Sequence, residues 1–175
     1  SSIASDDQKV KWKRLYGELD SVVLRIRIAA DIDSNSRPRE VRPMDAVGRK
    51  KYFYDILPIL EKIIDFGKQS DTGMLLAPTA HRFMELLNGV LSCEPLLVLR
   101  MAADVVSCSK RYGYNLDSMA MSEAAKLVES ILADYRENVQ ESVAITNLLE
   151  LLDAFVEAGW PEALNLVWRL DEIYR

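Results

Sequence analysis

The chain contains one histidine, His81, and this limits the chemistry that its side chains can perform. Catalytic triads and zinc sites both usually draw on histidine. The two cysteines, Cys93 and Cys108, are too few for a zinc set or a disulfide framework, and we interpret them as small buried apolar side chains. We therefore expect no metal site and no cofactor, and we interpret His81 as a surface or capping residue in the first turn of a helix.

Carboxylates are abundant in the second half of the chain, where two of them could form an acid–base pair. Such a pair must converge in a cleft that shifts its pKa values. The spacing here is that of exposed helix faces, which favours a solvated surface over a catalytic site, and Glu-x-x-His does not occur. A helical enzyme with an unrecognised carboxylate site stays an alternative, and it predicts a deep polar cavity. The carboxylates are Glu129, Asp134, Glu137, Glu141, Glu150, Asp153 and Glu157.

Two short motifs resemble nucleotide-binding signatures but lack the surrounding sequence. Asp65-Phe66-Gly67 spells the magnesium-binding triplet of kinases, yet no glycine-rich loop or catalytic-loop motif accompanies it. Gly67-Lys68 followed by Ser70 lacks the remainder of a phosphate loop, and a helix precedes it where that loop follows a strand. We therefore expect no catalytic residues in this chain.

A basic segment, residues 37–51, is the most suggestive feature of the sequence. Residues 1–51 carry a net charge of +4, whereas residues 52–175 carry −9. The basic side chains either pair with the acidic body of the same chain, or bind an acidic protein, or bind nucleic acid with Tyr52, Phe53 and Tyr54 stacking on bases. The candidate binding residues are Arg37, Arg39, Arg42, Arg49, Lys50 and Lys51.

Two tryptophans near the end of the chain are the other candidate contact residues. Trp160 lies in a turn, and Trp168 lies on a helix away from its main apolar stripe. An exposed tryptophan is a typical interface anchor, and packing within the chain is the other interpretation. Both residues are therefore candidates for partner binding.

Apolar residues recur at spacings of three and four along the chain, which predicts about seven amphipathic helices and no strands. The expected helices cover about 6–30, 45–66, 79–92, 95–111, 117–135, 138–158 and 161–174. The helix over 95–111 is apolar around most of its circumference, so we expect it to be central. Its polar stripe consists of Arg100, Asp104, Ser107 and Arg111. A long loop should occupy 31–44, and Pro58 should kink or split its helix.

Helix ends are also marked in the sequence. Thr79 should cap the third helix, and Asp117 or Ser122 should cap the fifth. Gly67, Gly113 and Gly159 are placed to end helices, and Pro95 and Pro161 to open them. These signals predict short connections between neighbouring helices, and therefore antiparallel hairpins.

Two of these hairpins look alike. Glu85-Leu86-Leu87-Asn88 precedes a turn and Pro95, and Glu150-Leu151-Leu152-Asp153 precedes a turn and Pro161, at an offset of about 65 residues. Paired helices with a proline opening the second resemble HEAT- and armadillo-type repeats over residues 79–174. The resemblance implies stacked helix pairs with a continuous core, a HEAT-like α-solenoid fragment, with an irregular helical bundle as the alternative.

Together these patterns predict a single all-α domain over 1–175, with a first helix and basic loop (1–44) and a helical-hairpin body (45–175). Because the chain starts without methionine, we expect it to be part of a larger protein. No apolar run approaches the roughly 20 residues of a membrane span. We expect a non-catalytic interaction or scaffolding module of the cytoplasm or another reducing intracellular compartment. Its partner would be another protein or another copy of itself, and nucleic-acid or phosphate binding through 37–51 is the alternative.

Overall fold

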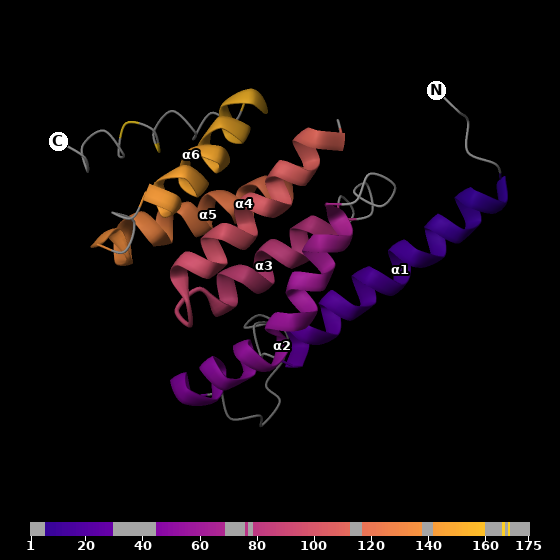
Figure 1. Ribbon diagram of the computed structural model, residues 1–175, viewed down its shortest axis with the longest axis horizontal. Coiled ribbons are helices and arrows are strands. Elements are labelled where there is room, and N and C mark those ends of the chain that lie inside the picture. Colours follow the sequence, from indigo (N-terminus) through magenta and orange to yellow (C-terminus); the bar gives the residue numbers. More distant parts are fainter. Residues whose placement is uncertain are drawn as a thin grey trace.

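The computed structural model describes residues 6–29, 45–68, 76, 79–112, 117–137, 142–159, 166 and 168, and it is all-helical with no strand in these ranges (Figure 1). Six helices are described, where the sequence predicts about seven. Of the expected last helix only Leu166 and Trp168 are described, and both are helical. The helices are α1 (Asp6–Ala29), α2 (Ala46–Gly67), α3 (Ala80–Val90), α4 (Pro95–Tyr112), α5 (Ser118–Asp134) and α6 (Ser142–Glu157).

The helices form two rows, because each helix packs mainly on the helix two positions away in the chain. Helices α1, α3 and α5 follow one another in the first row, and α2, α4 and α6 in the second. Contacts between α3 and α4 and between α5 and α6 join the rows. The chain thus alternates between the rows (Figure 1).

Helix α4 is central, as its apolar circumference predicts. It contacts α2, α3, α5 and α6. Its buried side chains point in nearly every direction around the helix, so water is excluded from most of its surface. They are Val98, Leu99, Met101, Ala102, Ala103, Val105, Val106 and Cys108. Cys93 and Cys108 are free and buried, in agreement with their interpretation as small apolar side chains.

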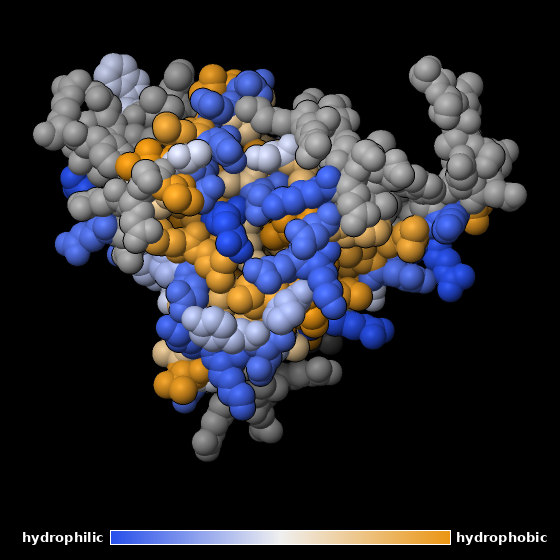
Figure 2. All heavy atoms as spheres, viewed as in Figure 1, coloured by the Kyte–Doolittle hydropathy of each residue, from blue (hydrophilic) through white to orange (hydrophobic). Residues whose placement is uncertain are grey.

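The polar stripe of α4 pairs with its two neighbours in the second row. Arg100 forms an ion pair with Glu61 of α2 at 3.3 Å, and Asp104 forms one with Lys68 at 2.8 Å. On the other side, the Ser107 hydroxyl donates a hydrogen bond to Glu150 of α6 at 3.2 Å. Hydrophilic side chains accordingly gather over the middle of the face shown in Figure 2. These contacts fix the position of α4 along its neighbours.

Aspartates cap two helices, and one expected threonine cap is wrong. The Asp45 carboxylate accepts a hydrogen bond from the Gly48 amide at 2.7 Å, and Asp117 accepts one from the Ala120 amide at 2.6 Å. Thr79 precedes α3 but makes no capping bond. Its buried hydroxyl donates instead to Asp20 of α1 at 3.2 Å, because α1 packs against the start of α3. Gly159 ends α6 with a φ of +67°, the left-handed conformation that glycine adopts readily.

Pro58 lies inside α2 and does not interrupt it. The ribbon of α2 changes direction partway along its length in Figure 1, as expected where proline removes a backbone hydrogen bond. Gly67 is the last residue of α2, and it is required there for a reason the sequence does not reveal. A Cβ atom at this position would lie 2.0 Å from Cδ1 of buried Leu76.

Several expectations lie outside the described residues: the loop over 31–44, Gly113 as the end of α4, Pro161 and the turn at Trp160. Among the helices that are described, none combines the length and the apolar character that a membrane span requires.

Candidate functional site

The first half of α1 projects beyond the other helices (Figure 1). The buried side chains of α1, Val23 and Ile26, lie in its second half, and Asp20, Arg27 and the Ile26 carbonyl contact α3 or α2 there. In the first half, Val10 is 70% exposed and Leu15 is 36% exposed. The amphipathic pattern of α1 predicts buried residues along its whole length. Among its described side chains, only those in the second half are buried.

This projecting half is also basic. Residues 9–17 contain four lysines or arginines and no acidic residue. Lys11 and Arg14 are exposed, and Arg14 pairs with Glu18 one turn further along the same helix. The segment therefore combines positive charge with exposed apolar side chains.

Helix α6, in the other row, presents the opposite character. It contains Glu150, Asp153 and Glu157 and no basic residue. Leu149 and Val156, which the sequence pattern places inward, are 50% and 51% exposed, and Leu151 is buried in their place. Because α6 is apolar at most positions, the pattern alone does not identify which side faces the core. The outer face of α6 is acidic and partly apolar.

The described part of the basic segment lies at the start of α2. The Lys50 ammonium pairs with Glu94 at 3.1 Å, and the Tyr54 hydroxyl donates to the same carboxylate. These bonds, from Tyr54 first and then Lys50, lower the pKa of Glu94, and Glu94 raises the pKa of both partners. Part of the segment's charge is thereby neutralised within the chain.

The other residues of this segment are arranged in different ways. Phe53 is fully buried, Tyr52 is half-buried and donates to the Ile26 carbonyl at 2.8 Å, and Tyr54 is 47% exposed. Arg49 is half-buried and Lys51 is exposed. Arg37, Arg39 and Arg42 lie outside the described residues, as does Trp160, whereas Trp168 is 69% exposed.

An open polar cleft of about 420 Å³ lies between α2 and α4. Three carboxylates line it, those of Glu61, Asp65 and Asp104, together with Lys68 and Arg100. Two of the three are ion-paired, with Arg100 and Lys68 respectively. The cleft thus contains the carboxylates that a helical enzyme needs, but it is open, and its charges are largely balanced.

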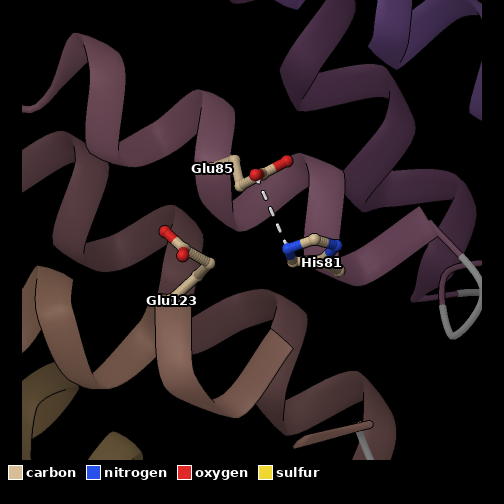
Figure 3. Close-up of side chains that lie close together, drawn as sticks. All are labelled: His81, Glu85 and Glu123. Carbon is tan, nitrogen blue, oxygen red and sulfur yellow. Dashed lines mark ion pairs between the residues drawn. The ribbon is translucent and has the colours of Figure 1, made fainter. Parts of the chain in front are cut away.

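Three potential metal ligands converge where α3 meets α5 (Figure 3). His81 and Glu85 lie four residues apart on α3, and Nε2 of His81 is 3.6 Å from Oε1 of Glu85. Glu123 comes from α5, and one donor atom from each of the three lies within 4.8 Å of the others. All three side chains are partly buried, with 15–21% of their surface exposed. We call these residues the α3–α5 cluster.

Neighbouring side chains hold both carboxylates of the α3–α5 cluster in place. Nη1 of Arg27, from α1, lies 2.5 Å from Oε2 of Glu85. The Asn88 amide donates to Oε2 of Glu123 at 3.0 Å and to the Glu123 carbonyl at 2.9 Å. Lys126 pairs with Oε1 of Glu123 at 2.5 Å, and this contact raises the pKa of Lys126.

Sequence reasoning considered His81 alone and missed the α3–α5 cluster. The spacing of His81 and Glu85 was a usable signal, since residues four apart share one face of a helix. The contribution of Glu123 depends on α3 packing against α5, which the sequence does not specify.

No protein-family model, no curated protein and no solved structure matches this chain.

Proposed function

We propose that this chain is a non-catalytic interaction module that assembles with further copies of itself. The observation that carries the proposal is the projecting first half of α1, which carries basic residues and exposes the apolar side chains of Val10 and Leu15. A short helix segment is marginal in water without tertiary contacts, so this half gains stability when another surface covers it.

The surface that fits it best is the outer face of α6 in a second copy. Residues 9–17 contain four basic residues and no acidic one, and α6 has three acidic residues and no basic one. Exposed Val10 and Leu15 can contact Leu149 and Val156, so apolar burial adds to the charge attraction.

Such an interface joins two different surfaces, so it is head-to-tail. Contacts of this type produce rings or open chains of subunits. The two-row stacking of helices supports this arrangement, since stacked repeats associate where their ends are uncapped. It also supports the proposed resemblance to HEAT- and armadillo-type repeats. The similar segments at Glu85 and Glu150 lie in different rows, however, so the 65-residue offset does not match the repeating helix pair.

The test is a charge swap followed by size-exclusion chromatography with light scattering. Variant A carries Lys11→Glu and Arg14→Glu, and variant B carries Asp153→Lys and Glu157→Lys. The wild type should form oligomers that dissociate at high salt. Each variant should be monomeric alone, because its two surfaces then carry the same sign of charge. Their mixture should form oligomers again, because opposite charges meet at both kinds of contact between a copy of variant A and a copy of variant B.

A matched control distinguishes this interface from a general effect of net charge. Arg25→Glu with Lys62→Glu changes two exposed positive charges elsewhere and should leave the oligomer intact. Val10→Glu should weaken assembly, because Val10 is 70% exposed on the proposed interface. Val47→Glu, at a valine 79% exposed at the start of α2, should leave the oligomer intact. A wild type that is monomeric at all concentrations and salt levels rejects self-assembly.

Nucleic-acid or phosphate binding through residues 37–51 is the competing function, and a triple variant with Arg37→Ala, Arg39→Ala and Arg42→Ala tests it. It predicts that the wild type binds single-stranded RNA with an affinity that falls steeply with salt. Lys50 and Phe53 are engaged within the chain, which weighs against a stacking surface at the start of α2.

A further inference from the structure

We propose that the α3–α5 cluster is a binding site for a divalent transition metal, with Zn²⁺ as the ion that its donor set fits. The ligands would be Nε2 of His81, one carboxylate oxygen of Glu85 and one of Glu123. Imidazole nitrogen with carboxylate oxygen suits zinc, whereas calcium and magnesium prefer oxygen alone.

The spacing of the donor atoms is close to that of a zinc site. Zinc binds nitrogen and carboxylate oxygen at about 2.0–2.2 Å, so neighbouring ligands of a tetrahedral ion lie about 3.4 Å apart. The 3.6 Å between His81 and Glu85 nearly matches this distance, and the 4.8 Å limit for the whole set requires only a small inward rotation of side chains. Three protein ligands leave the fourth position for water.

The surroundings orient the ligands as outer residues do in known metal sites. Arg27 holds Oε2 of Glu85, which turns Oε1 toward His81 (Figure 3). Asn88 fixes both the backbone and the side chain of Glu123. Residues of this kind restrict the ligands to the binding geometry.

The ammonium group of Lys126 lies beside the α3–α5 cluster, on its solvent side. Lys126 pairs with Glu123, and its side chain is 62% exposed. Zinc would displace this ammonium, which can swing into water. Lysine therefore competes with the metal and weakens its binding.

The experiment is a titration of the tag-free protein with zinc chloride, followed by calorimetry and by the melting temperature. The wild type should bind one zinc ion, and its Tm should rise with zinc concentration, because an ion that binds only the folded state stabilises it. His81→Gln and Glu123→Gln should each weaken binding at least about tenfold. Lys126→Met should tighten it, since the competing cation is removed.

Glu129→Gln, on an exposed part of the same helix α5, is the matched control and should bind like the wild type. The Lys126→Met variant must also keep the wild-type Tm in the absence of zinc, because a damaged fold would expose the buried thiols of Cys93 and Cys108, which bind zinc as well. The proposal is overturned by a wild type without saturable zinc binding, or by undiminished binding in His81→Gln, which would point to other ligands such as Cys93 or Cys108.

Discussion

The carboxylate of Glu94 joins α2 to the start of α4 through Tyr54 and Lys50. These bonds lower its pKa in the folded state, so their contribution to stability is present above the ordinary glutamate pKa of about 4.3. That contribution is lost as the pH falls through the lower folded value. We expect Tyr54→Phe to reduce the free energy of unfolding at neutral pH, with a difference from wild type that shrinks in acid. Urea melts across the acidic range measure it.

Tyr52→Phe is the control for this pH dependence. The Tyr52 hydroxyl donates to the Ile26 carbonyl, which does not titrate. The loss of unfolding free energy caused by Tyr52→Phe should therefore stay constant from neutral pH into the acidic range. If the loss of unfolding free energy caused by Tyr54→Phe also stayed constant, the hydrogen bond from Tyr54 would not shift the pKa of Glu94.

Gly67 is a second single residue with a testable role. Its missing Cβ leaves room for Leu76, which is 1% exposed and cannot move into solvent without losing its packing. We expect Gly67→Ala to destabilise the fold by about 1–3 kcal/mol, the usual cost of overpacking. Chemical denaturation gives this value.

A double substitution distinguishes this clash from a backbone effect. In a Leu76→Ala background the nearest atoms, Cδ1 and Cγ, are gone. The further cost of Gly67→Ala should then be small. An equal cost in both backgrounds would mean that Gly67 is needed for its conformational freedom.

Among the helices, α1 has two halves that differ in their described tertiary contacts. The buried side chains Val23 and Ile26 lie in its second half. Gly17 lies within its projecting half, and a Cβ at this position would meet no other atom within 4 Å. Glycine in an exposed helix interior is about 1 kcal/mol less favourable than alanine. We expect Gly17→Ala to increase the helical content of residues 9–18, measured by NMR chemical shifts. Gly17→Val should increase the helical content less, because valine is β-branched. If Gly17→Ala caused no change, the first half of α1 would already be fully helical in the wild type.

The helices themselves were largely predictable from local pattern. Helix α4 is apolar around most of its circumference, so its central place follows from the need to cover it. Asp117 marks the start of α5 in the sequence. Its short side chain precedes an apolar run and accepts a hydrogen bond from the Ala120 amide, which has no partner within the helix. The pattern is less decisive for α6, where apolar residues occupy most positions and the exposed Leu149 and Val156 cannot be told from the buried Leu151 by periodicity.

The partners of side chains across the fold were not predictable. Glu61 meets Arg100, and Glu123 meets His81, over separations of about 40 residues. These meetings depend on the two-row packing and on the position of each helix along its neighbour. The sequence shows that a helix has a polar stripe, but it does not show which residues of another helix lie opposite that stripe.

At the scale of the whole molecule, the two rows mean that each helix relies mainly on the helices next to it in its own row. Opening at one end of such a stack leaves the remainder largely intact, so local unfolding free energies should decrease from the middle toward the ends. Amide hydrogen exchange should therefore be slowest in α4 and fastest in the first half of α1. Exchange at one uniform rate throughout the helices would show that the stack opens only as a unit.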